Sequence, residues 1–183
     1  MNKKILVGGT IVMLAVKSVL GQDNATNNPG PNDDQGRIYR ANELSVDAFG
    51  TGSLGAYTIN HVSNARVRHN IRFGAGAGIN YFFTRNLGIG GDVYSENTTG
   101  AFIDSTSGNL ILRIPLGESG LAPYIFGGGG YQFDLTKAAF GQAGAGLEFR
   151  FTPNVGLFVD ARGVVPDKAK YYGVGRLGIR FAF

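Results

Sequence analysis

The closing segment of the chain alternates strictly between two kinds of residue. Arg176 and Arg180 share one side of this segment with glycine and alanine, and the chain ends on an aromatic residue. The residues of the apolar side are Leu177, Ile179, Phe181 and Phe183. Successive side chains of a β-strand point to opposite faces, so one face would be apolar and the other charged. This pattern is typical of a transmembrane β-barrel, whose outer face contacts lipid while its inner face lines a polar lumen.

The same alternation recurs along most of the chain, with turn residues between the runs. Eight runs can be counted, at 43–51, 67–83, 87–96, 105–115, 121–133, 140–151, 155–164 and in a last run ending at Phe183. Thirty glycines, a mean hydropathy near zero and no long apolar run after residue 21 argue against a bundle of spanning helices. The sequence therefore predicts an all-β fold, an eight-stranded antiparallel up-and-down transmembrane β-barrel.

The connections between the runs alternate in length. Those at 84–86, 117–120 and 152–154 are short, whereas those near 52–66, 96–105, 133–140 and 165–171 are longer and more polar. Outer-membrane barrels place short turns in the periplasm and long loops outside the cell. With eight strands, both ends of the barrel segment fall on the short-turn side.

The N-terminal part is predicted to be a targeting segment. Lys3 and Lys4 precede an apolar stretch over 5–16, and small residues precede a cleavage site near Gln22. We expect a signal peptide over 1–21, a flexible periplasmic leader over 22–42 and the barrel over 43–183; the alternative is a retained N-terminal anchor. Without 1–21 the net charge falls from +4 to about +1, which gives no argument for nucleic-acid binding.

The chain contains no cysteine. Disulfide bonds are therefore excluded, and so is a lipoprotein anchor, which requires a cysteine to carry the lipid. An exported chain of this composition must be held by its own hydrogen bonds and core.

Aromatic residues gather where the two interfacial belts of a barrel are expected. Near the short turns lie Tyr81, Phe82, Phe83, Tyr124, Phe126, Phe149, Phe151, Phe181 and Phe183. Near the long loops lie Tyr94, Tyr131, Phe133, Phe140, Tyr171 and Tyr172. In the glycine-rich run 121–133, whose facing is ambiguous, Tyr124 and Phe126 are predicted to face lipid. The alternative is a soluble β-sandwich or lipocalin-like barrel with its apolar face turned inward.

The predicted inner face is charged. Its members are Asp47, Arg72, Asp92, Glu96, Arg113, Glu148, Arg150, Asp160, Arg162, Arg176 and Arg180. Buried charges must be paired or hydrated, and eight strands enclose a space just wide enough for side chains. We expect a salt-bridge network that plugs the lumen; the alternative is a narrow, arginine-lined pore of low conductance.

Three stretches carry a resemblance to a known family. They are GAGLEFRFTPNVGLFVDAR over Gly144–Arg162, the glycine-dense Tyr124–Tyr131 and the closing GVGRLGIRFAF. They resemble the small outer-membrane β-barrel superfamily, which includes the OmpA membrane domain, the OmpX type and the opacity proteins. Over 43–183 the resemblance implies an eight-stranded barrel in the bacterial outer membrane. It implies no single activity, because members include adhesins, anchors, narrow pores and a few enzymes.

One motif offers an enzymatic alternative. His61-Val62-Ser63-Asn64 resembles the His-x-Ser-Asn motif of the lipid A 3-O-deacylase barrels, in which the histidine is the base and the serine the nucleophile. Here the motif lies early, and the acidic partner expected downstream is replaced by Ala75 and its small neighbours. We therefore predict no enzymatic activity, no cofactor and no metal site, with a lipid A-modifying hydrolase using His61 and Ser63 as the low alternative.

The sequence thus predicts a monomeric outer-membrane protein with a structural, adhesive or partner-binding role through its external loops. Its expected partners are the lipid bilayer with lipopolysaccharide, an extracellular ligand at the loops and the barrel-assembly machinery. The apolar side of the last strand is the expected assembly signal.

Overall fold

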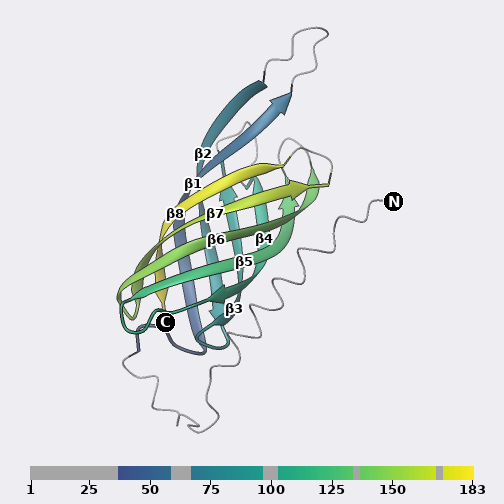
Figure 1. The fold of residues 1–183 in the computed structure, drawn as a ribbon. Coiled ribbons are helices and arrows are strands. Elements are labelled where there is room, and N and C mark those ends of the chain that lie inside the picture. Colours follow the sequence, from purple (N-terminus) through teal and green to yellow (C-terminus); the bar gives the residue numbers. More distant parts are fainter. Residues whose placement is uncertain (1–36, 59–66, 97–102, 134–136, 168–170) are drawn as a thin grey trace, which may run out of the picture. The chain divides into compact units, whose positions relative to one another are not determined.

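A computed structural model describes residues 37–58, 67–96, 103–133, 137–167 and 171–183. The prediction of an all-β fold is confirmed, because these residues form eight strands (Figure 1). The strands are β1 (Glu43–Thr58), β2 (Val67–Phe82), β3 (Leu87–Ser95), β4 (Ser105–Arg113), β5 (Leu121–Gln132), β6 (Ala138–Thr152), β7 (Val155–Pro166) and β8 (Tyr172–Ala182). Among the described residues, no helix is long and apolar enough to cross a membrane.

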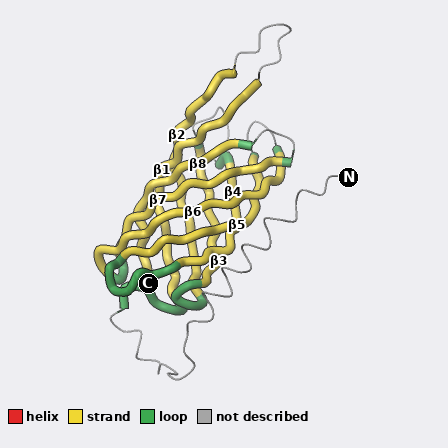
Figure 2. Tube along the Cα trace, viewed as in Figure 1, coloured by secondary structure: helices red, strands yellow, loops and turns green. Residues whose placement is uncertain are grey.

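Each strand pairs antiparallel with its neighbour in sequence, and β8 pairs with β1, so the sheet is a closed barrel. Closure gives every strand two partners, which satisfies the backbone groups that lipid cannot. The polypeptide enters β1 and leaves β8 at the end where the short turns lie (Figure 2). The Phe183 amide donates to the Leu44 carbonyl at 2.8 Å, which extends the β1–β8 ladder to the last residue.

The strands are staggered around the barrel. Following directly paired residues once around leads from Ser45 to Gly55, ten residues further along β1. The path is Ser45, Asn80, Gly90, Asn109, Gly128, Gln142, Val164, Tyr172 and Gly55. A stagger of this size with eight strands implies a tilt of about 40° and an interior that side chains fill.

Side chains alternate along every strand, and the outward set is apolar. Phe73 is 74% exposed and Leu177 is 64% exposed, and such exposure of large apolar side chains is expected where they face lipid rather than water. The outward aromatics stack in pairs two residues apart at both ends of the barrel. Ring centroids lie 5.2 Å apart for Tyr81–Phe83, 5.1 Å for Phe149–Phe151 and 5.2 Å for Tyr131–Phe133.

Six aromatics predicted for the interfacial belts point into the lumen instead. Five of them, Phe82, Tyr94, Tyr124, Phe126 and Phe140, are at most 6% exposed, and the half-buried Tyr172 packs against Phe140. The prediction that Tyr124 and Phe126 face lipid is wrong because the register fixes the opposite facing. Tyr124 lies directly opposite the inward Arg113, and cross-strand partners share a face. The neighbouring Ile125 faces outward and is 45% exposed.

Inward glycines make room for these rings. A Cβ added at Gly144 would lie 2.6 Å from the Phe126 ring and 2.5 Å from the Ala161 carbonyl oxygen. One added at Gly178 would lie 2.7 Å from the Phe158 ring. The glycine-rich strands are therefore a packing requirement of a narrow, aromatic-filled lumen.

The β1–β2 hairpin is longer than predicted. The first strand was expected to end near residue 51, but β1 continues to Thr58. Its pairing with β8 stops at Gly55, and the pairing of β2 with β3 begins only at Ala75. The distal part of this hairpin is therefore paired only within itself and projects beyond the other strands (Figure 1). Ser53, Leu54 and Gly55 continue the alternation of β1 beyond residue 51. The glycines of this stretch make that alternation hard to recognise in the sequence.

Candidate functional site

The charged residues predicted for the inner face lie inside the barrel. Ten of them are at most 9% exposed, and Arg72 is half-buried. They come from seven different strands or strand ends, so residues far apart in the sequence meet across the lumen. They separate into three groups along the barrel axis, which we call the basal, central and mouth clusters.

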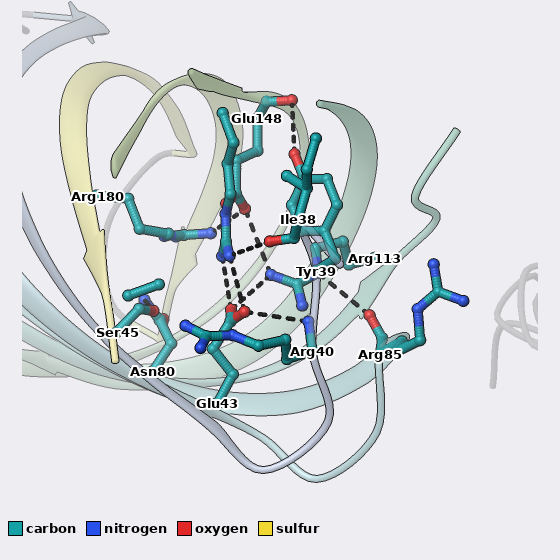
Figure 3. A network of polar contacts seen from close by, with 12 residues as sticks. Ile38, Tyr39, Arg40, Glu43, Ser45, Asn80, Arg85, Arg113, Glu148 and Arg180 are labelled. Carbon is teal, nitrogen blue, oxygen red and sulfur yellow. Dashed lines mark hydrogen bonds and ion pairs between the residues drawn. The ribbon is translucent and has the colours of Figure 1, made fainter. Parts of the chain in front are cut away.

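The basal cluster lies at the short-turn end and consists of Glu43, Asp47, Arg113, Glu148, Arg150 and Arg180 (Figure 3). Glu43 accepts from Arg113 Nη1 at 2.9 Å and from Arg150 Nη2 at 2.6 Å. Glu148 accepts from Arg150 Nε at 2.6 Å and from Arg180 Nη1 at 2.6 Å. Three carboxylates therefore face three guanidinium groups, and the cluster is neutral.

Arg180 connects the basal cluster to β1. Its Nε and Nη2 donate to the two carboxylate oxygens of Asp47, each at 2.7 Å. This is the two-pronged geometry in which a guanidinium pairs most strongly with a carboxylate. Asn80 also donates to Asp47, at 2.9 Å.

The central cluster consists of Asp92, Asp160, Arg162 and Arg176. Arg176 donates to both oxygens of Asp160, at 2.8 and 2.7 Å, and to Asp92 at 3.0 Å. Arg162 donates to Asp92 at 3.2 Å. The Tyr124 hydroxyl donates to Asp160 at 2.7 Å. Two acids thus balance two arginines, as in the basal cluster.

A small cavity separates the basal and central clusters. It has a volume of about 10 Å³, and its lining includes Asp47, Asp92, Arg176 and Arg180. A space of about this size holds one water molecule when polar groups line it. The interior between the two clusters is therefore filled by side chains, with room for a single bridging water.

The mouth cluster lies at the long-loop end and consists of Ser53, Arg72, Glu96, Asp104 and Ser105. Ser53 donates to Glu96 at 2.8 Å, and Asp104 accepts from the Glu96 amide. Three buried oxygens of this cluster have no hydrogen-bond partner among the described residues: Glu96 Oε1, Asp104 Oδ1 and Ser105 Oγ. A cavity of about 10 Å³ lies beside them. Burial raises the pKa of the Glu96 carboxyl, which lies beyond the end of β3.

Aromatic rings back the arginines of the lumen. The Arg113 guanidinium lies 3.7 Å from the centre of the Phe82 ring, and that of Arg176 lies 4.9 Å from the Phe49 ring. A guanidinium over an aromatic face gains electrostatic attraction without a hydrogen bond. These rings therefore complete the surroundings of charges that would otherwise be poorly solvated.

Several residues in or against these clusters were absent from the predicted lumen. Glu43 pairs with two arginines, yet it begins the first strand and was not assigned to the lumen; the parity of Glu43 with Asp47 could have found it. Tyr124 was placed on the wrong face. Tyr39 precedes all the strands, and no periodic signal marks it. Its side chain is 1% exposed and contacts the basal cluster.

The apolar side of β8 lies on the outer face as predicted. Leu177, Ile179, Phe181 and Phe183 are 64, 43, 42 and 67% exposed. Their role as an assembly signal stays a prediction. His61 and Ser63 lie outside the described residues.

The chemistry available in the lumen is charge pairing. Among the described residues, no group of three histidine, cysteine, aspartate or glutamate side chains is placed to hold a metal ion. The carboxylates of the basal and central clusters accept hydrogen bonds from arginine, so they are held in place rather than presented to a substrate. The arrangement can close the lumen, neutralise its own charge and fix the barrel register.

Comparisons with known proteins identify the fold. No protein-family model and no curated protein sequence matches the chain. The N-terminal β-barrel domain of OprF from Pseudomonas aeruginosa matches at 21% identity and a TM-score of 0.60, covering 79% of this chain and 99% of that one. Ail, the attachment invasion locus protein of Yersinia pestis, matches at 19% identity and a TM-score of 0.55, covering 78% and 99%.

Neisserial surface protein A is a third match, at 17% identity and a TM-score of 0.55, covering 76% of this chain and 97% of that one. A further structure of Ail, in complex with the heparin analogue sucrose octasulfate, matches at 15% identity and a TM-score of 0.50, covering 78% and 99%. This chain therefore shares the complete barrel of its structural neighbours.

Proposed function

We propose, from the premise that this chain has the fold of the small eight-stranded outer-membrane β-barrels, that it is a closed barrel acting through its external side. In this proposal the barrel is a rigid membrane anchor, and the long-loop end makes structural, adhesive or partner contacts. The outer membrane is its location, since its lipid-facing belt and its structural neighbours agree on that environment.

The observation that carries the proposal is the packing of complementary charges across the lumen. The basal and central clusters each contain as many arginines as carboxylates, and ion pairs in both join strands that are not neighbours in the sheet. The cavities beside them have volumes of about 10 Å³ each. A conducting pore needs a continuous hydrated path, whereas a filled interior of this kind favours an anchor.

Reconstitution in a planar bilayer tests the closed lumen. We expect the protein to insert and to give no steady current at moderate salt. A steady, salt-dependent conductance that disappears in Arg113→Ala or Arg150→Ala would contradict the proposal and support the narrow pore. Insertion is checked by the different gel mobility of unboiled and boiled protein; a protein that is soluble without detergent and lacks this shift would contradict the membrane location.

The projecting β1–β2 hairpin is the proposed contact element. Between Asp47 and Asp92 the chain has no acidic residue, while Arg66 directly precedes β2 in the sequence and Arg68 lies within it; Arg72 belongs to the mouth cluster. A basic segment without compensating acids attracts polyanions. We therefore assign phosphorylated or sulfated saccharides as its partner class; the structure of Ail with a heparin analogue is a precedent in a structural neighbour.

Binding to immobilised heparin and to lipopolysaccharide tests this assignment. We expect retention that weakens with salt and that falls at least about tenfold when Arg66 and Arg68 are both replaced by glutamine. Lys137→Gln is the matched control, since Lys137 is an exposed cation next to another long loop. Equal loss in the control would mean that the hairpin is not the contact element.

The absence of enzymatic activity stays a prediction. The deacylase alternative is tested by the acylation state of lipid A in cells that express the protein. His61→Ala and Ser63→Ala should leave it unchanged; a change that both substitutions abolish would establish the enzyme.

A further inference from the structure

The segment before the first strand is folded into the barrel base. Tyr39 precedes β1, yet its side chain is buried at the short-turn end (Figure 3). Its hydroxyl donates to the Gly120 carbonyl at 2.7 Å. The guanidinium groups of Arg113 and Arg150 each lie 4.5 Å from the centre of its ring. A phenol between two guanidiniums, with its hydroxyl satisfied, is a specific set of contacts rather than a chance approach.

The backbone of the segment is bound as well. Arg150 Nη1 donates to the Ile38 carbonyl at 2.9 Å, and the Arg40 amide donates to Glu43 at 3.3 Å. The same Arg150 therefore contacts the ring and the main chain of the segment. These contacts require a peptide of defined direction, since the carbonyl and the ring must reach one side chain together.

A sharp bend returns the chain into the lumen. Asn42 has φ 52°, and it is the one non-glycine residue with a positive φ in the described part of the chain. Asparagine tolerates this left-handed conformation better than most residues. The Tyr81 hydroxyl donates to the Asn42 side chain at 3.2 Å, which holds the bend against the outer rim.

The receiving surface is built from residues of the barrel alone. Gly120, buried at the start of β5, has φ 72° and presents its carbonyl to the Tyr39 hydroxyl and to the Arg150 amide. Arg113 and Arg150 are themselves fixed by Glu43 and Glu148. Burial raises the pKa of the Tyr39 phenol, so it stays a hydrogen-bond donor.

We propose that the short-turn end of the barrel is a peptide-binding site for a tyrosine-containing segment, occupied in cis by residues 37–42, which closes this end of the lumen. In this arrangement residues 37–42 cover the basal cluster. It stands on the contacts of Tyr39 and does not rest on the proposed function of the loops. Either proposal can therefore fail while the other holds.

Chemical protection in the unmodified protein is the first test. In the folded, detergent-solubilised protein, tetranitromethane should nitrate Tyr171, which is 79% exposed, at least about tenfold faster than Tyr39, as measured by mass spectrometry of peptides. After unfolding, both should react alike. Equal nitration in the folded state would overturn the proposal without any question of misfolded variants.

Binding in trans is the second test. In a full-length variant with residues 37–41 replaced by glycine and serine, a labelled peptide of residues 36–41 (GRIYRA) should bind saturably. The same peptide with Tyr39→Ala should bind at least about tenfold more weakly, and the wild-type protein, whose site is occupied, should bind neither. A peptide that binds wild type and variant alike, or neither, would overturn the site. The gel-mobility shift confirms that the variant is folded.

Discussion

The two ends of the lumen are built from the same kinds of residue but differ in how their charges are balanced and covered. At the short-turn end, the basal cluster matches three carboxylates with three arginines, and the chain covers it with Tyr39. At the long-loop end, the mouth cluster has two carboxylates and one arginine. Its leftover groups are acceptor oxygens, whereas the leftover groups at the base are guanidinium donors: Nη2 of Arg113, which lies over aromatic rings, Nε and Nη2 of Arg40, and Nε of Arg85.

The difference indicates which end of the barrel balances its own charges and which end depends on partners from its surroundings. A buried acceptor without a donor costs free energy unless water or a ligand supplies one. The base balances its charges with its own ion pairs, while the mouth has unpaired carboxylate oxygens that need donors from water or from a bound partner. The base is thus the structural end, and the mouth is the end that responds to its environment.

The largest effect is expected from removing an arginine of the base. Arg150→Ala would leave Glu43 and Glu148 buried with fewer partners and would release the Ile38 carbonyl. Breaking a buried pair in this way costs about 3–5 kcal/mol. Urea unfolding in lipid vesicles measures it, and a loss below about 1 kcal/mol would mean that the basal cluster is hydrated.

A matched pair of substitutions compares the two ends directly. Glu43→Gln removes a charge that accepts from two arginines and should cost about 2–3 kcal/mol in the free energy of unfolding. Glu96→Gln removes a buried charge with an unpaired oxygen and should cost less than about 0.5 kcal/mol or stabilise the protein at neutral pH. Equal costs would show that the two ends do not differ.

The centre of the lumen should respond less than the base. Tyr124→Phe deletes one hydrogen bond to Asp160, which keeps its two bonds from Arg176. A hydrogen bond to a charged group contributes about 1.5 kcal/mol, and this loss should appear in the same unfolding measurement. Tyr131→Phe is the control, because Tyr131 lies on the outer face and should change the stability little.

The smallest effect is a pH dependence confined to the mouth. Burial raises the pKa of Glu96 in the folded protein above its unfolded value. Below the unfolded pKa the group is protonated in both states and contributes no difference. As pH rises through the folded pKa, its ionisation destabilises the folded protein.

The melting temperature of the wild type relative to Glu96→Gln should therefore fall as the pH rises above the ordinary pKa of a glutamate and through the raised pKa of Glu96. Glu118→Gln, at an exposed short-turn position, is the control substitution. If the melting temperatures of the wild type and of Glu96→Gln change in parallel with pH, Glu96 is not the group that responds to pH.

Periodicity accounts for what the sequence predicts well. The strand runs, the short turns and the inward charges follow from alternation, because a lipid face on one side and a lumen on the other enforce it over every strand. The predicted second run at 67–83 differs from β2 by one residue. Alternation fails where both faces carry small or aromatic residues, as around Tyr124, since neither face is then marked by charge.

The alternation of residues cannot predict contacts that depend on how the barrel closes in three dimensions. Tyr39 belongs to no strand, and its burial depends on a bend at Asn42 and on a carbonyl 81 residues away. Likewise, which arginine pairs with which carboxylate depends on the stagger of the strands, which alternation does not specify. The members of the lumen could be predicted, but their partners could not.

The stagger of ten has a consequence for how the barrel closes. The seam between β1 and β8 can shift only in steps of two residues, because a single-residue slip would turn one inner face outward. A two-residue slip would yield a barrel of different width, with the lumen filled differently. Asp47 and Arg180 are direct cross-strand partners at this seam and are joined by two hydrogen bonds. A slip of two would place Arg180 opposite Ser45 or Phe49, so this pair selects one circumference among those that the alternation allows.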